Sequence, residues 1–169
     1  LTAPELWPAQ GKEWFALYDA SFWQKRITAF GYREYPRDDR NSDWSMDVDA
    51  GPVIAGHGVA ASAYGMGAAR KNGRFDRAYP LAAELLATVG ELPNGTLAIP
   101  RLLSNFSDAP MLGETAILWQ LSTEPDKGFG VKTGGSVSGY VYIVLGTIFL
   151  CGLWRLLSAI ENVRATWRP

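Results

Sequence analysis

The densest group of oxygen ligands in the sequence lies between residues 38 and 49 and contains Asp38, Asp39, Asn41, Asp43, Asp47 and Asp49. Asp39, Asn41 and Asp43 occupy alternate positions, as the first ligands of a calcium-binding loop do. The glycine and the closing glutamate of such a loop are missing from their required places, and Arg37 and Arg40 offset the negative charge. We therefore interpret the segment as a solvated loop with helix-capping carboxylates, keep calcium binding as the alternative, and predict no cofactor.

Acid and base catalysis is the second chemistry that these residue types allow. Asp47 and Asp49 form a carboxylate pair, and two carboxylates in unequal environments can divide the acid and base roles. Asp49 also precedes Pro52, a suitable first residue of a helix, where the helix dipole explains a carboxylate without catalysis. His57 is the remaining candidate base, and we interpret it as a hydrogen-bonded packing residue of the same helix.

The sequence excludes several other chemistries. It contains one histidine and one cysteine, Cys151, which excludes a multi-histidine metal site, a cysteine-based zinc site and an intrachain disulfide. No GxSxG, P-loop or dinucleotide-binding motif is present. The formal net charge of -1 shows no basic surplus for nucleic acid. A catalytic role for Asp47, Asp49 or His57 is therefore a hypothesis, and the leading expectation is a protein that is not an enzyme.

The strongest pattern in the chain is an apolar segment near the C-terminus. Residues 133 to 154 carry no formal charge, and a transmembrane helix needs about 20 mostly apolar residues to cross about 30 Å of hydrocarbon. Tyr140 and Tyr142 lie at one end and Trp154 at the other, where aromatic rings favour the headgroup level. The segment predicts a membrane helix from near Tyr140 to near Trp154. The alternative is a fully buried helix of a soluble core.

Three glycines, Gly139, Gly146 and Gly152, interrupt this apolar segment. Small residues allow a second membrane helix to approach closely, so we treat these three as candidate partner-binding residues. The other interpretation is that glycine is simply more frequent in membrane helices than in soluble ones.

The charges that flank the segment predict its orientation. Arg155, Arg164 and Arg168 lie on its C-terminal side, and Lys127 and Lys132 lie on its N-terminal side. An excess of Lys and Arg marks the cytoplasmic side. The flanks therefore favour a cytoplasmic C-terminus and a main domain that is periplasmic or extracellular. A tail-anchored domain in the cytosol is the competing arrangement.

The predicted fold class is mainly α: a small helical domain with an αα-hairpin, residues 1–132, precedes one transmembrane helix, residues 133–160, and a short basic tail, residues 161–169. Apolar residues at helical spacing predict four helices in the domain, over residues 12–30, 53–71, 76–89 and 110–121. The second and third form a hairpin that closes at Asn72 and Gly73. No strand pattern of comparable strength is visible.

The predicted second helix carries a stripe of small residues, Ala61, Gly65 and Ala69. This stripe follows the segments GYREYP (31–36) and DVDAGPVI (47–54) and precedes KNG (71–73). Together, over Gly31 to Gly90, they resemble one hairpin of the (α/α) toroid domain of membrane-associated proteins similar to linalool dehydratase/isomerase. The resemblance implies a fragment or a reduced relative of a toroid, because a complete one needs more helices than this chain supplies. No catalytic residue is assigned to this chain from the resemblance.

These observations lead to two hypotheses about function. The sequence contains seven Trp, seven Tyr and seven Phe, which predict exposed apolar patches and interface anchors such as Trp23. The leading hypothesis is a single-span accessory subunit that packs on a larger membrane complex, with the lipid bilayer and larger integral membrane subunits as its partners. The alternative is a membrane-tethered toroid-type enzyme fragment, a lyase or isomerase or a glycan-active enzyme, that needs further hairpins from a missing segment or a partner.

Overall fold

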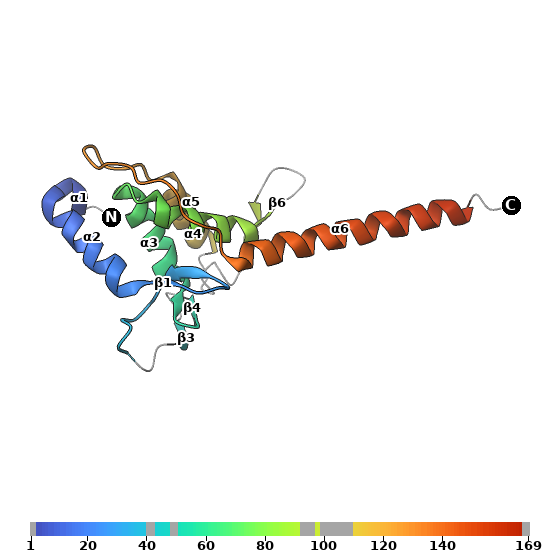
Figure 1. Cartoon of the computed structure of the whole chain (residues 1–169), viewed down its shortest axis with the longest axis horizontal. Helices are drawn as coiled ribbons and strands as arrows, with labels where there is room; N and C mark the ends of the chain where they lie inside the picture. The colour runs from blue at the N-terminus through green and yellow to red at the C-terminus, as the bar shows by residue number, and fades with distance from the viewer. Residues whose placement is uncertain (1–2, 40–42, 48–50, 92–96, 99–109, 167–169) are drawn as a thin grey trace.

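The computed structural model describes residues 3–39, 43–47, 51–91, 97–98 and 110–166. It shows a folded body built from the residues before position 139 and one long helix that projects away from it (Figure 1). The chain is mostly helical, as predicted, but its body also contains three small antiparallel sheets. The first sheet carries Gln24 and Lys25, two residues of the candidate site described below.

The body begins with two helices, α1 (Ala3–Leu6) and α2 (Pro8–Phe22). Pro8 occupies a first helical position, where its missing N–H costs nothing. The predicted helix over residues 12–30 is wrong beyond Phe22, because the chain turns there into the strands β1 (Trp23–Lys25) and β2 (Phe30–Tyr32). The two strands pair antiparallel, with Trp23 opposite Tyr32.

A second correction concerns the start of the small-residue helix. Residues 53–58, predicted as helix, belong to a three-stranded sheet of β3 (Trp44–Asp47), β4 (Gly51–Ile54) and β5 (His57–Gly58). The turn between β4 and β5 has positive φ at Ala55 (51°) and Gly56 (80°). A right-handed helix cannot pass through two such residues, so the helix begins only at Val59.

The helical hairpin follows this sheet as predicted. Helix α3 (Val59–Lys71) turns at Asn72 and Gly73 into α4 (Phe75–Thr88), and Gly73 has φ 68°. A short pair of strands, β6 (Gly90–Glu91) and β7 (Leu97–Ala98), comes next. Helix α5 (Pro110–Ser122) packs against α3 and closely matches the predicted fourth helix.

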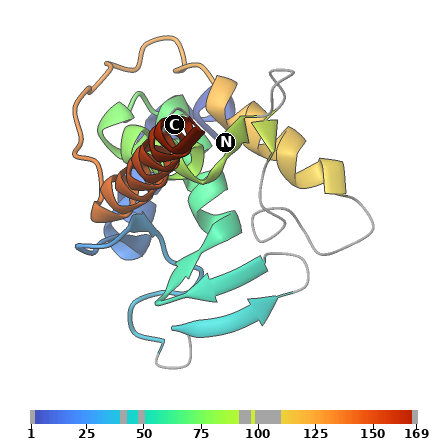
Figure 2. The same cartoon turned by 90° about the vertical axis from the view of Figure 1, so that its right-hand side faces the viewer.

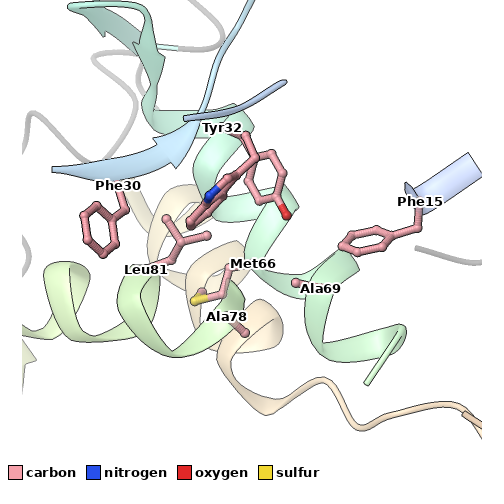
Figure 3. Packing of buried hydrophobic residues seen from close by; sticks show 8 residues of the cluster. Phe15, Phe30, Tyr32, Met66, Ala69, Ala78 and Leu81 are labelled. Carbon is pink, nitrogen blue, oxygen red and sulfur yellow. The ribbon is translucent and has the colours of Figure 1, made fainter. Parts of the chain in front are cut away.

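The hydrophobic core lies where α2, the first hairpin, α3 and α4 meet (Figure 3). Its buried members are Phe15, Trp23, Phe30, Tyr32, Met66, Ala69, Ala78 and Leu81. A Cβ added to Gly65 would lie 2.1 Å from the ring of Tyr32. At Gly65 the stripe of small residues on α3 therefore makes room for an aromatic ring from a strand.

Helix α6 (Gly139–Thr166) contains 28 residues and extends well beyond the predicted end near Trp154. At about 1.5 Å per residue it is about 42 Å long. Within its segment Gly139–Arg164, the most apolar stretch of 18 residues has a mean hydropathy of 2.0, and none of that stretch is buried. Figures 1 and 2 show this helix leaving the body as a single rod. It is long and apolar enough to cross a membrane.

Candidate functional site

A surface pocket of about 430 Å³ lies beside the first hairpin. Its lining residues are Gln24, Lys25, Arg26, Arg33 and Arg37. Four of the five are cations, and no carboxylate is among them. A pocket of this composition attracts anions, and arginine in particular recognises phosphate and carboxylate through its planar fork of N–H donors.

Arg33 forms the floor of the pocket, since it is only 8% exposed. Its guanidinium donates hydrogen bonds to the Gln24 side-chain oxygen (3.2 Å), the Tyr35 carbonyl (3.2 Å) and the Asp43 carboxylate (3.3 Å). A Cβ on Gly56 would lie 2.5 Å from its Nη1 atom, so the β4–β5 turn covers this charge closely. Arg33 is therefore held in one position.

The other cations surround this fixed charge and are exposed. Arg37 donates a hydrogen bond to the Trp23 carbonyl. Lys25 donates to the Ser136 hydroxyl at 3.0 Å and lies 4.8 Å from the centre of the Phe30 ring. The Arg26 side chain makes no hydrogen bond or ion pair with a described residue. The pocket thus combines a rigid, buried arginine with three exposed cations.

The pocket adjoins the start of α6. The tip of the β1–β2 hairpin supplies two carbonyls to the unpaired N–H groups of the first helical turn: Gly139 N–H donates to Ile27 (3.1 Å) and Tyr140 N–H donates to Thr28 (2.8 Å). The Ile27 side chain is 94% exposed. Figure 1 shows the hairpin reaching the base of α6, so the pocket, an exposed apolar tip and the apolar helix share one end of the body.

His57 lies next to this pocket, on β5 and not inside a helix as predicted. Burial, followed by the charges of Arg26 and Arg33, lowers the pKa of His57 to about 4. Among the described residues, neither of its two buried ring nitrogens has the hydrogen-bond partner that was predicted. The imidazole is neutral at pH 7, and no described carboxylate is bonded to it to assist general base chemistry.

The acidic candidates are not brought together in the described structure. Asp43 pairs with Arg33, which takes it away from a calcium site. Asn41 and Asp49 lie outside the described residues, and so does the side chain of Asp47. Within the described part of the chain, including Asp39, no group of three or more His, Cys, Asp or Glu side chains is placed to hold a metal ion.

A buried ion network lies on the opposite side of the first hairpin. Asp19 accepts hydrogen bonds from Arg77 at 3.0 to 3.1 Å and from the Tyr32 hydroxyl at 3.1 Å. Burial, then the charge of Asp19, raises the pKa of Tyr32, which keeps the hydroxyl a neutral donor. Arg74 lies 3.8 Å from Asp19 and bonds Asp76, lowering the pKa of that carboxyl. The network connects α2, β2 and α4, which is a structural role.

Trp23 belongs to the core and not to an exposed aromatic surface. It is 7% exposed, its ring meets Tyr32 edge to face at 5.1 Å, and the Arg77 guanidinium lies 4.7 Å above it. Its expected role as a partner anchor is therefore corrected, because the side chain is already covered within the body. Replacing it would damage folding before it could affect association.

The three glycines of α6 divide into two groups. A Cβ on Gly139 would lie 2.8 Å from the Ile27 carbonyl oxygen, so the hairpin contact explains this glycine within the chain. Gly146 and Gly152 have no atom within 4 Å of such a Cβ, leaving out their own helix backbone and chain neighbours. Nothing in the described body requires these two glycines, and they stay available for an external contact.

Comparison with known protein families, with curated proteins and with solved structures finds no match. The resemblance to (α/α) toroid domains therefore stays a prediction, and the function has to be argued from the geometry of the chain itself.

Sequence reasoning missed the basic pocket because it placed Lys25 and Arg26 inside a helix. A signal for the hairpin exists, since the aromatic residues Phe30 and Tyr32 alternate with Gly31 as strand residues do. The pocket itself has no sequence signal of this kind, because Arg33 and Arg37 reach it from the chain that leaves the second strand.

Proposed function

We propose that this chain is a single-span membrane-anchored accessory subunit that packs on a larger membrane protein complex. The observation that supports it most directly is α6, whose apolar side chains from Leu145 to Val163 are exposed. Examples are Ile148 (61% exposed), Phe149 (68%) and Leu150 (64%). A soluble protein seldom exposes a continuous apolar surface of this length, whereas a bilayer covers it.

The length of α6 agrees with this proposal. Its length of about 42 Å exceeds the hydrocarbon thickness of about 30 Å, which leaves about two turns to reach into the interfaces. Arg155 can extend its charged end outward from the boundary. Each Leu, Ile, Phe or Val near the centre contributes about -0.3 to -0.6 kcal/mol to insertion.

A Cβ added at Gly146 or Gly152 would meet nothing within 4 Å. These positions support packing against a helix of another membrane subunit, because small residues let a second helix approach closely. The body adds exposed apolar residues on α1, on α2 and at the junction between them: Leu6, Trp7, Trp14 and Leu17, each about half exposed or more. Tryptophan is a favoured anchor in protein interfaces. These two surfaces favour a subunit over a free-standing domain.

We further propose the orientation with the body outside and the C-terminus in the cytoplasm. The cations of the basic pocket do not alter this argument, because charges in long domains distant in sequence from the span contribute little to orientation. Protease added to intact cells or spheroplasts should remove the body and spare the C-terminal residues. Protection of the body would instead support the tail-anchored arrangement.

Two experiments test the subunit proposal. Carbonate extraction should leave the full chain in the membrane pellet, and deletion of residues 137–169 should release it. Intact chain in the supernatant would contradict the membrane anchor.

In a mild detergent the chain should co-purify with larger membrane proteins. Gly146→Leu should weaken this association, whereas Ile148→Leu, a matched change two residues away, should not. A chain that purifies alone from its native membrane contradicts the subunit role.

A further inference from the structure

We propose that the pocket formed by Gln24, Lys25, Arg26, Arg33 and Arg37 binds a phosphate group, and that this phosphate belongs to the headgroup of an anionic phospholipid. The inference deepens the proposed function and rests on it, since it requires α6 to cross a bilayer. A membrane anchor needs only α6, so the cluster of cations in this pocket requires a separate explanation, and a bound phosphate supplies it.

The chemistry of the lining residues supports a phosphate ligand. Phosphate oxygens accept several charge-assisted hydrogen bonds at once, and arginine supplies paired donors in a rigid fork. Arg33 is already desolvated and fixed by its three acceptors, so ordering it on binding costs little. Asp43 neutralises part of its charge, while Lys25, Arg26 and Arg37 supply further positive charge from the exposed rim.

The position of the pocket selects the phospholipid as the source of the phosphate. The Ile27 and Thr28 carbonyls are hydrogen-bonded to the first two residues of α6, so the hairpin tip stays at the level where the apolar helix begins. That level is the headgroup region if the helix spans the bilayer. The pocket, which includes Lys25 and Arg26 next to this tip, would therefore lie near the lipid phosphates of a bilayer that α6 spans.

Ile27 supplies the second part of the membrane contact. Its side chain is 94% exposed although it lies at the tip of a hairpin whose neighbours Trp23 and Phe30 are buried. An apolar tip beside several cations is typical of segments that rest in a membrane interface, where the apolar group enters the acyl boundary and the cations meet anionic headgroups. A soluble phosphate ligand would not explain the exposed isoleucine.

The chain contains its own reporter for this site. His57 is the single histidine, and the charges of Arg26 and Arg33 act on it across the pocket wall. An anion bound between these arginines offsets their positive field, so it should raise the pKa of His57. Glu34 is a further charged group near this wall, since its carboxylate closely approaches Gly58, and its effect is the same in every variant compared below.

The test uses the full chain in a phosphate-free maltoside detergent at about 0.15 M salt. Dihexanoyl phosphatidylglycerol, dihexanoyl phosphatidylcholine and inorganic phosphate are titrated separately, and the His57 ring signals are followed by NMR. The test variant is K25Q/R26Q. The matched control is K12Q/K127Q, which removes the same net charge from residues that do not line the pocket.

We expect saturable binding of phosphatidylglycerol with a raised His57 pKa, weaker binding of the other two ligands, and at least a tenfold loss of phosphatidylglycerol affinity in K25Q/R26Q. The control should change by less than twofold. Tighter binding of inorganic phosphate than of phosphatidylglycerol overturns the lipid assignment, and so does equal binding of the two lipids. Equal loss in the control variant, or no saturable binding, overturns the site.

Failure of the inference and failure of the proposed function are distinguishable. Carbonate extraction of the same variants reports the span alone, because neither Lys25 nor Arg26 belongs to α6. A chain that stays in the membrane pellet but binds no phosphatidylglycerol contradicts only the headgroup site. A chain that is extracted contradicts the span on which the inference rests.

Discussion

Large apolar and aromatic side chains are buried in the core of the body but exposed along most of α6. In the body, Tyr32 is fully buried and Met66 is 1% exposed, and both pack in a core that several elements share. In α6, Phe149 and Leu150 are more than 60% exposed, although they are equally apolar. The body therefore encloses its own apolar interior, whereas the helix requires an apolar environment from outside.

The two regions also differ in their charged residues. The body buries Asp19 and satisfies it with Arg77 and Tyr32, while the segment of α6 before Arg155 contains no charge to satisfy. A substitution that leaves a charge unpaired should thus damage the body through folding and the helix through insertion. The following predictions separate these two effects.

The largest effect should come from Asp19→Ala. This change leaves Arg77 partly buried without its carboxylate, and removal of one partner of a buried ion pair costs about 3–5 kcal/mol. Urea unfolding of the full chain in detergent, followed by near-UV circular dichroism, measures the loss. Glu5→Gln breaks the exposed pair with Lys71 and should cost less than about 1 kcal/mol. Similar losses in both variants would show that the Asp19 network is not a main support of the body.

The next effect belongs to α6. Leu145→Lys replaces a favourable central residue with a charge that costs about 2.5–3.5 kcal/mol on the insertion scale. The variant should lose carbonate-resistant membrane association, and the near-UV spectrum of the body should not change. Leu145→Ile is the matched control and should stay in the pellet. Full retention of the lysine variant would indicate that α6 does not sit in the hydrocarbon at this position.

A smaller effect is expected where α3 meets the aromatic core. Gly65→Ala places a Cβ against the ring of Tyr32, and overpacking of this kind typically costs about 1–3 kcal/mol. Gly130→Ala is the control, since its Cβ would meet nothing within 4 Å. Urea unfolding of the two variants compares the costs. A variant at Gly65 as stable as the wild type would mean that the ring moves without cost.

The smallest effect is a pH dependence that His57 contributes. Its pKa is about 4 in the folded protein against 6.5 for the free side chain, so the unfolded chain binds more protons between these values. Stability from this group is therefore complete above about pH 6.5 and decreases as the pH falls toward 4. The loss should be about 1–2 kcal/mol after allowance for the partial exposure of the ring.

His57→Gln isolates this contribution from that of the carboxylates. The free energy of unfolding of the wild type should fall relative to that of the variant as the pH decreases from 7 to 4, because the variant lacks the titrating ring. Parallel curves would mean that His57 titrates alike in the folded and unfolded chains.

The sequence alone determined the elements whose signal is local. The absence of charge over residues 133–154 predicted an apolar helix near the C-terminus, and the turn at Asn72 and Gly73 predicted the hairpin of α3 and α4. Helix α5 was found in the same way. These signals are strong because composition and turn chemistry act on residues that are neighbours in the chain.

Tertiary structure decided the first hairpin and everything that depends on it. The aromatic residues between Trp14 and Phe30 fit one face of a helix, but the helix ends at Phe22, and the pairing of Trp23 with Tyr32 makes the following residues a hairpin. This pairing moves Trp23 into the core and brings Lys25 and Arg26 next to Arg33, and it carries Ile27 to the base of α6. Contacts between residues 27 and 139 bridge more than a hundred positions, and local periodicity contains no information about such distances.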